Sequence, residues 1–136
     1  MRTFALLIIA ITMSFFGELL LKKGIKDLHD SGGLDKFQLS PGPILQTGWN
    51  VFTNVFVIMG FVLIFGGSIF WLAVIADWNL SLAYPLLSLN YLFIVAASYF
   101  YFHEQVSWLK VLGVLVIIGG VAMVFLGDSS TQGTKQ

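Results

Sequence analysis

The sequence predicts an all-α membrane protein with four transmembrane helices, and three observations carry this prediction. Hydrophobic residues make up 57% of the 136 residues and charged residues only 10%, whereas about 25% of a soluble domain is charged. Four apolar runs each have roughly the 20 residues that a helix needs to cross a bilayer. Because four helices of this length enclose little space, we expect dimerisation to complete the bundle.

The predicted membrane domain covers residues 1–127. Its spans are residues 4–21, 51–76, 82–102 and 108–126. We expect the first run to be retained as a span, because it is too long for a signal peptide and lacks a small-residue cleavage site. The polar connection 24–48 contains glycine and proline breakers, and the polar tail 128–136 is expected to be disordered.

The shorter features of the chain agree with four spans. Trp49 and Trp78 flank the second span at depths that suit the membrane interfaces. A tight turn is predicted at 77–81, and Pro85 falls in the first turns of the third span, where proline costs little. Ser107 is the predicted N-cap of the fourth helix.

The distribution of basic residues predicts an orientation. Four spans place both termini on one side, and most lysines flank the two loops of the other side. The positive-inside rule therefore favours cytoplasmic loops and periplasmic termini.

Composition argues against several classes of function. The net charge is zero and no basic run stands out, which argues against a nucleic-acid partner. The chain has no cysteine, so disulfides and thiolate chemistry are excluded. The spacing of His29 and His103 does not suit a metal site, and phosphate-loop and dinucleotide motifs are absent. We therefore predict neither a metal nor a cofactor.

Glu18 is the only formal charge well inside a predicted span. A charge at the centre of a membrane helix costs roughly 2.5 kcal/mol or more, so its presence indicates a functional site. Ser14, Glu18 and Lys22 recur every four residues and share one helix face, which suits a polar pathway that pairs Glu18 with a cation or a proton. Alternatively, Glu18 and Lys22 lie about 6 Å apart along the helix and extend to the interface as an ion pair.

The third span carries a predicted stripe of hydroxyl groups. Tyr84, Ser88 and Tyr91 fall on this stripe, together with Ser98, while Asn90 points toward a neighbouring helix. Aromatic rings and hydroxyls suit a sugar or an amphipathic headgroup. Trp71 of the second span either lines the same cavity or fills the bundle. The alternative role for all these groups is hydrogen bonding between helices, at about 0.6 kcal/mol for each bond.

Glycines recur every seven residues in the fourth span, at Gly113, Gly120 and Gly127, and the second span repeats the spacing at Gly60 and Gly67. Such a groove allows close approach of a second helix. The fourth-span groove is either a dimer interface or packing within the protomer, and the small size of the chain favours the dimer.

Several segments carry a family resemblance: Leu82–Asn90, His103–Ser107, Leu112–Val114, Ile117–Val121 and, more weakly, Ser68–Leu72 with Gly17 and Lys22. Together they resemble the four-helix, EamA-like branch of the drug/metabolite transporter superfamily. Within it, the chain is most similar to the small subunits of aminoarabinose-phosphoundecaprenol flippases.

That resemblance implies a carrier of the bacterial inner membrane, not an enzyme, that moves a polyprenyl-phosphate-linked sugar or a related lipid between leaflets. We expect such a carrier to act as a homodimer or together with a similar subunit. Tyr84, Ser88 and Tyr91 would contact the sugar, Lys22 or Lys23 the phosphate, and Glu18 an amine of the sugar.

Two alternatives stay open. The related small multidrug exporters carry an essential glutamate one turn earlier, where this chain has Ser14; this difference weakens a proton-coupled cation exporter without excluding it. The other alternative is a structural subunit that anchors a glycosyltransferase or a transporter half in the membrane and transports no substrate itself.

Overall fold

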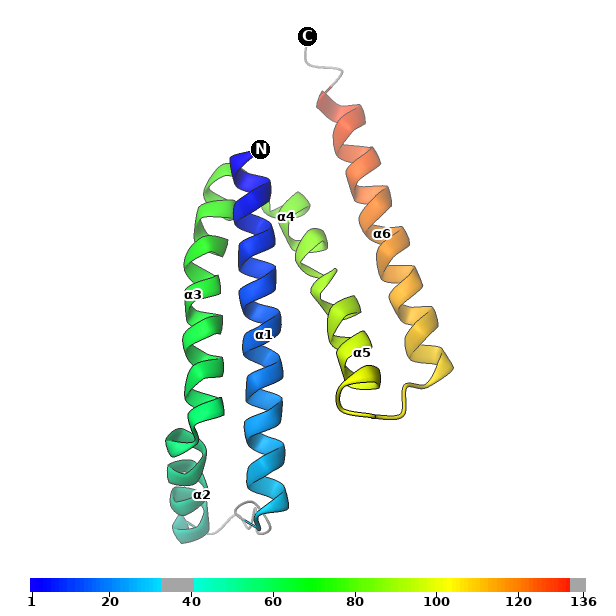
Figure 1. The fold of residues 1–136 in the computed structure, drawn as a ribbon. Helices are drawn as coiled ribbons and strands as arrows, with labels where there is room; N and C mark the ends of the chain where they lie inside the picture. Colours follow the sequence, from blue (N-terminus) through cyan, green and yellow to red (C-terminus); the bar gives the residue numbers. More distant parts are fainter. Residues whose placement is uncertain (33–40, 133–136) are drawn as a thin grey trace.

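The computed structural model describes residues 1–32 and 41–132, and every regular element in these ranges is helical. The elements are α1 (Arg2–Asp30), α2 (Pro41–Thr53), α3 (Val55–Asp77), α4 (Leu80–Leu87), α5 (Asn90–Phe100) and α6 (Trp108–Gln132). Four segments are long and apolar enough to cross a membrane: Arg2–Asp30, Val55–Asp77, Leu80–Phe100 and Trp108–Gly127. The predicted fold class is confirmed, and the start of α1 and the described end of α6 lie at the same end of the bundle (Figure 1).

Helices α1 and α3 form the most closely packed pair and lie side by side (Figure 1). Glycines allow this approach: a Cβ atom built on Gly17 would lie 2.8 Å from the carbonyl oxygen of Gly60, and one built on Gly60 would lie 2.8 Å from the carbonyl oxygen of Gly17. Membrane helices associate through such small residues because apolar side chains gain little over lipid contact.

A small apolar core joins the helices at the end where α1 begins. Its buried members come from four helices and are Leu7, Val74, Ala83, Leu86 and Val121. A hydrogen bond of 2.8 Å from Thr3 Oγ1 to Asp77 Oδ2 closes the same end. Helix α6 lies at one edge of the bundle, beyond α4 and α5 (Figure 1), and most of its large apolar side chains are exposed in the single chain.

The first part of the chain is more helical than predicted. Helix α1 continues past residue 21 to Asp30 and α2 begins at Pro41, so both ends of the predicted connection 24–48 are helical. Lysines end an apolar span but do not end a helix. Gly24 is retained within α1 because α3 packs on it: a Cβ there would lie 2.7 Å from Val57 Cγ2.

The predicted second span, residues 51–76, is divided at Asn54. The side-chain oxygen of Asn54 accepts hydrogen bonds from the backbone N–H groups of Phe56 and Val57, at 2.9 and 3.3 Å. These are the bonds of an N-cap residue, and they start α3 at Val55.

The predicted third span, residues 82–102, is discontinuous. Pro85 lies inside α4, not in a harmless first turn, and α4 ends two residues later. Pro85 has no N–H group to donate to the preceding turn, and Ser88 Oγ donates to the Pro85 carbonyl at 2.5 Å. Backbone N–H groups at Leu89 and Tyr91 then bond three residues back, at 3.2 and 3.0 Å, the tighter pattern of a 3₁₀ turn.

The last helix begins where it was predicted and extends farther. Leu109 N–H donates to Ser107 Oγ at 3.2 Å, which confirms Ser107 as an N-cap. Helix α6 continues to Gln132, beyond the predicted start of the tail at residue 128, because polarity ends a membrane span without ending a helix. Residues 133–136 of the predicted tail, and 33–40 of the predicted connection, lie outside the described residues.

Candidate functional site

Glu18 faces the point at which the third span is broken. The side-chain amide of Asn90, the first residue of α5, donates to both carboxylate oxygens of Glu18 at 3.4 Å. The prediction that Asn90 points toward a neighbouring helix is therefore confirmed. Asn90 Oδ1 is buried and accepts no hydrogen bond from the described part of the chain. Discontinuous helices often form substrate sites in transporters, and this site offers a carboxylate and an amide oxygen.

Lys22 lies one turn beyond Glu18 but makes its ion pair elsewhere. Lys22 Nζ is 2.6 Å from Glu104 Oε2 and donates to Ser98 Oγ at 3.2 Å. The Ser98 hydroxyl in turn donates to the same carboxylate oxygen at 3.0 Å, and the ammonium lies 4.6 Å from the centre of the Phe102 ring. The structure therefore does not contain the alternative Glu18–Lys22 pair. We call Lys22, Ser98 and Glu104 the ion-pair cluster.

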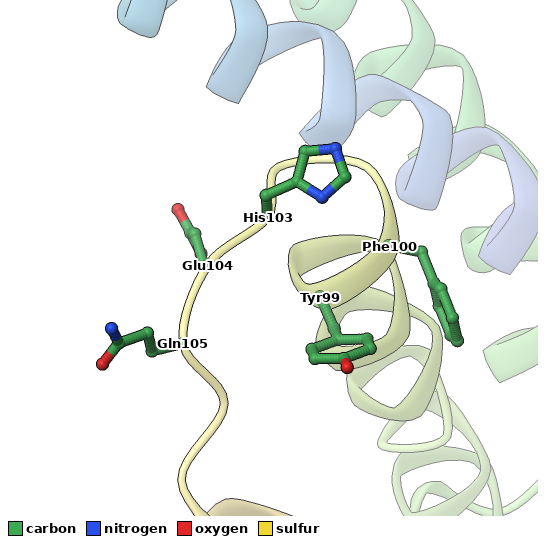
Figure 2. A pocket seen from close by; sticks show the side chains of 5 residues that line it. All are labelled: Tyr99, Phe100, His103, Glu104 and Gln105. Atoms are coloured by element: carbon green, nitrogen blue, oxygen red, sulfur yellow. The ribbon is translucent and has the colours of Figure 1, made fainter.

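The backbone that follows α5 turns Glu104 back toward α1. His103 has a φ of 53°, in the left-handed region that few residues other than glycine adopt. Glu104 N–H then donates to the Ser98 carbonyl at 3.0 Å. Figure 2 shows the loop side chains His103, Glu104 and Gln105 beside Tyr99 and Phe100 at the end of α5; together they line a cavity of about 330 Å³.

The electrostatics of the ion-pair cluster favour an ionised Glu104. The hydrogen bond from Lys22, followed by the one from Ser98, holds the pKa of the Glu104 carboxyl below its ordinary value. Hydrogen bonds to the charged form of an acid have this effect. The cluster is partly open to solvent, with 38% of the Lys22 side chain and 48% of the Glu104 side chain exposed.

The predicted stripe of hydroxyl groups on the third span does not form one surface, because its residues contact different parts of the structure. Tyr84 packs edge-on against Trp71 of α3 at 5.5 Å between ring centres, and Trp71 also packs on the apolar core. The Ser88 hydroxyl donates its hydrogen bond to the Pro85 carbonyl within the same span. Tyr91 instead lines a cavity of about 110 Å³ that also contacts Ser98, Glu104 and Lys110. Of the predicted third-span residues, Asn90 is the one that bonds to Glu18.

The first-span residues that were predicted to share a face contact different neighbours. Ser14 Oγ would be 3.1 Å from a Cβ built on Gly67 of α3, whereas Glu18 meets α5. Lys23 Nζ lies over the Phe56 ring of α3 at 4.3 Å. Only Lys22 of the two candidate lysines therefore lies in the ion-pair cluster.

An apolar cavity of about 250 Å³ lies between α1 and the two halves of the third span. Its lining residues are Phe4, Leu7, Ile8, Ile11, Thr12, Leu86, Leu89 and Phe93. Phe15 extends this surface toward Glu18 by packing on Phe93 at 5.9 Å between ring centres. One stripe of α1 therefore changes along its length from apolar, at Phe4, Ile8 and Ile11, to charged, at Glu18 and Lys22.

The fourth-span glycines face away from the protomer. A Cβ built on Gly113 or Gly120 would meet no atom of the described chain within 4 Å. The buried residues of α6, Val114 and Val121, lie about 100° around the helix from these glycines. Packing within the described protomer therefore does not account for Gly113 and Gly120. Gly127, the third predicted glycine, ends the α6 span.

Sequence reasoning named Ser98 only as part of a stripe and gave no role to Glu104 or Lys110. The available signal was the segment His103–Ser107, which carries part of the family resemblance. An acid in a short loop has no lysine partner that can be recognised from spacing, because Lys22 is 82 residues away.

The structure has four apolar spans, one of them discontinuous. It also has a half-buried carboxylate at Glu18 and an ion pair between α1 and the loop after α5. These features define a multi-pass membrane protein with a partly exposed polar site between α1 and the third span. The chain belongs to the EamA-like transporter family, whose model matches residues 35–126. The predicted family resemblance is confirmed.

Curated relatives carry the name probable 4-amino-4-deoxy-L-arabinose-phosphoundecaprenol flippase subunit ArnE. The protein of Enterobacter sp. (strain 638) is 38% identical over 66 residues, 48% of this chain and 62% of the relative. That of Pseudomonas fluorescens (strain Pf0-1) is 44% identical, over 47% of this chain and 54% of the relative. That of Aeromonas salmonicida (strain A449) is 32% identical, over 56% and 67%. The chain thus spans about half to two thirds of the relatives' length, and no solved structure matches it.

Proposed function

We propose that the chain is a subunit of a flippase that moves a polyprenyl-phosphate-linked amino sugar, or a related lipid, across the bacterial inner membrane. The observation that carries the proposal is the stripe of α1 that runs from Phe4, Ile8 and Ile11 to Glu18 and Lys22, beside the broken third span. A surface that is apolar at one end and charged at the other suits a ligand with an apolar tail and a charged headgroup. The flippase-subunit names of the relatives support the same substrate class.

The proposed roles follow from chemistry and position. Glu18 and the free oxygen of Asn90 accept hydrogen bonds from a protonated amine, while Lys22 binds the phosphate one helical turn away, about 6 Å along the axis. The tail lies in the apolar cavity beside Leu89 and Phe93. The protein thereby lowers the cost of bringing a polar headgroup into hydrocarbon, without chemical change to the substrate.

A second subunit is part of the proposal. Leu109, Val116 and Met123 are 76, 74 and 74% exposed and lie beside Gly113 and Gly120 on the outer face of α6 by helical periodicity. In α3, glycines of the same spacing pack directly against α1. We infer that a helix from a second copy or a similar subunit packs in the same way on the outer face of α6.

Because the chain lacks cysteine, a single Val116→Cys substitution tests this interface by disulfide crosslinking in membranes. Val62→Cys is the matched control: Val62 is also exposed, at 64%, and lies on α3. Crosslinked dimers are expected for Val116→Cys alone. Equal crosslinking of the two variants would count against the α6 interface, and no crosslinking of either would exclude a second copy as the partner at this face.

Transport is tested in vesicles that contain the chain with its membrane partner and a polyprenyl-phosphate amino sugar in one leaflet. Glu18→Gln keeps the shape and removes the charge that binds the amine, so transfer of the amino sugar should fall about ten- to a hundredfold, the range for a hydrogen bond to a charged group. Transfer of the analogue with a hydroxyl in place of the amine should change little. Asp30→Asn, an exposed acid of α1 that lies near His29, is the control.

A second candidate is a proton-coupled exporter of small cations. It is favoured by Glu18, whose hydrogen-bond donor among the described residues is an uncharged amide. Proton flux driven by a cation gradient, and lost in Glu18→Gln, would support it. Lipid transfer without such flux would exclude it, and a chain that transfers neither substrate class with any partner would be a purely structural subunit.

A further inference from the structure

We infer that Glu104 occupies the anion site of Lys22 and is displaced by the phosphate of the lipid headgroup, which releases the loop 103–107 from α1. The inference rests on the proposed function for the identity of the anion. It assigns to Glu104 and Ser98 roles in a closed, substrate-free state of the same site.

The ion-pair cluster has the contacts of an occupied anion site. One Glu104 carboxylate oxygen accepts hydrogen bonds from the Lys22 ammonium at 2.6 Å and from the Ser98 hydroxyl at 3.0 Å. A phosphate oxygen accepts the same two donors. The Lys22 ammonium is also fixed over the Phe102 ring, at 4.6 Å from its centre, and Phe102 itself is buried. The cationic side of the site is therefore preformed by Lys22 of α1, Ser98 of α5 and the buried Phe102 that follows α5, while its anion is carried by Glu104 farther along the loop.

The geometry of the loop makes this anion removable. Both charged side chains are partly exposed, at 38 and 48%, and such ion pairs contribute little to stability. The loop backbone passes through a left-handed conformation at His103. An external phosphate, with two charges or one, can therefore replace one exposed carboxylate without the cost of a deeply buried pair.

Displacement would also open the site. Glu104 lines both the cavity of about 330 Å³ at the end of α5 and the cavity of about 110 Å³ that contains Tyr91 and Lys110. Gln105 also lines both cavities, so movement of Glu104 and Gln105 with the loop would join the two cavities and leave a second cation, Lys110, near the departing loop.

A distance measurement tests the release of the loop without reference to transport. The cysteine-free chain accepts spin labels at Lys26→Cys on α1 and Gln105→Cys on the loop, both exposed positions. Farnesyl phosphate serves as the probe, and farnesol is its uncharged control. The distance between the labels should lengthen with farnesyl phosphate, remain unchanged with farnesol, and already be long in Glu104→Gln without any ligand.

Binding of the same probe gives the second readout. Glu104→Gln removes the competing charge but keeps a group that can bond to Ser98, so affinity for farnesyl phosphate should rise about two- to fivefold, as expected for a competing exposed ion pair. Lys22→Gln should abolish the preference for farnesyl phosphate over farnesol. Asp30→Asn removes an exposed acid outside the cluster and should leave affinity unchanged.

Each outcome bears on one claim. If Glu104→Gln leaves the affinity and the distance unchanged, or weakens binding, the ion-pair cluster is a structural clamp and the inference is overturned, even where lipid transfer proceeds. If farnesyl phosphate displaces the loop but no lipid crosses the bilayer, the anion site stands and the proposed function fails.

Discussion

The contact between α1 and α3 makes a quantitative prediction about one methyl group. In Gly17→Ala, the new Cβ would lie 2.7 Å from Ile64 Cγ1 and 2.8 Å from the Gly60 carbonyl oxygen. The backbone carbonyl cannot rotate away as a side chain would, so the two helices must separate. Insertion of a methyl group into a well-packed interface costs about 1–3 kcal/mol, and we expect the free energy of unfolding to fall by that amount.

Two glycines of the same chain provide matched controls. A Cβ on Gly66 meets only the flexible end of the Met13 side chain, at 2.6 Å from Cε, and methionine repacks easily; Gly66→Ala should therefore cost less than Gly17→Ala. A Cβ on Gly113 meets nothing within 4 Å. Because alanine is favoured over glycine inside a helix by roughly 0.5–1 kcal/mol, the protomer with Gly113→Ala should be as stable as the parent or slightly more stable.

Unfolding in mixed detergent micelles at low protein concentration, followed by circular dichroism, measures all three variants. The predicted order of stability is Gly113→Ala, then Gly66→Ala, then Gly17→Ala. Equal stability of Gly17→Ala and Gly113→Ala would show that α1 and α3 do not approach each other through Gly17. The contrast between a packed glycine at Gly17 and an exposed glycine at Gly113 of α6 would then lose its support.

Three further predictions concern caps, the helix break and pH. Asn54→Ala removes the oxygen that caps α3 and should lower the free energy of unfolding by about 1 kcal/mol, while Asn54→Asp should retain most of it. Pro85→Ala should restore a continuous helix through Ser88, seen as slower amide hydrogen exchange at 88–91 and as reduced lipid transfer; unchanged exchange would contradict the assigned cause of the break. The pKa of Glu104 is lowered in the folded protein, so its ion pair with Lys22 is fully present above pH 4.5, the ordinary pKa of the carboxyl, and is lost as the pH falls through the lowered pKa. Spin labels at residues 26 and 105 should therefore separate only in that acidic range. Separation of the labels between pH 7 and 6 would refute the assignment of Glu104 as the group that holds the loop.

Much of the fold could be predicted from hydropathy because burial in lipid selects long apolar helices irrespective of packing. The ends of the helices could not, since charge at Lys22 and Lys23 marks the edge of a span while α1 continues to Asp30. The break after Pro85 depends on local hydrogen bonds. The Ser88 hydroxyl donates to the Pro85 carbonyl, and the Leu89 N–H group bonds to Leu86, details that spacing alone does not specify.

The candidate site was predicted in part. Glu18 was identified because a carboxylate inside a span is rare, and its contact with Asn90 joins two residues that were selected separately. The partner of Lys22 could not be predicted, because a turn at His103 brings Glu104 from a distant loop. The glycine repeats were equivalent in sequence, yet Gly60 packs against α1 and Gly120 faces outward. Tertiary contacts alone distinguish the two.

Photocrosslinking of a bound lipid tests the central claim most directly. A polyprenyl-phosphate amino sugar with one photoreactive group in the tail and one in the headgroup would be activated in membranes that contain the chain and its partner, and labelled residues would be identified by mass spectrometry. The account predicts tail labels near Ile8, Ile11 and Phe93, and headgroup labels between Glu18 and Lys22. Headgroup labels confined to α3, or to the outer face of α6, would contradict it.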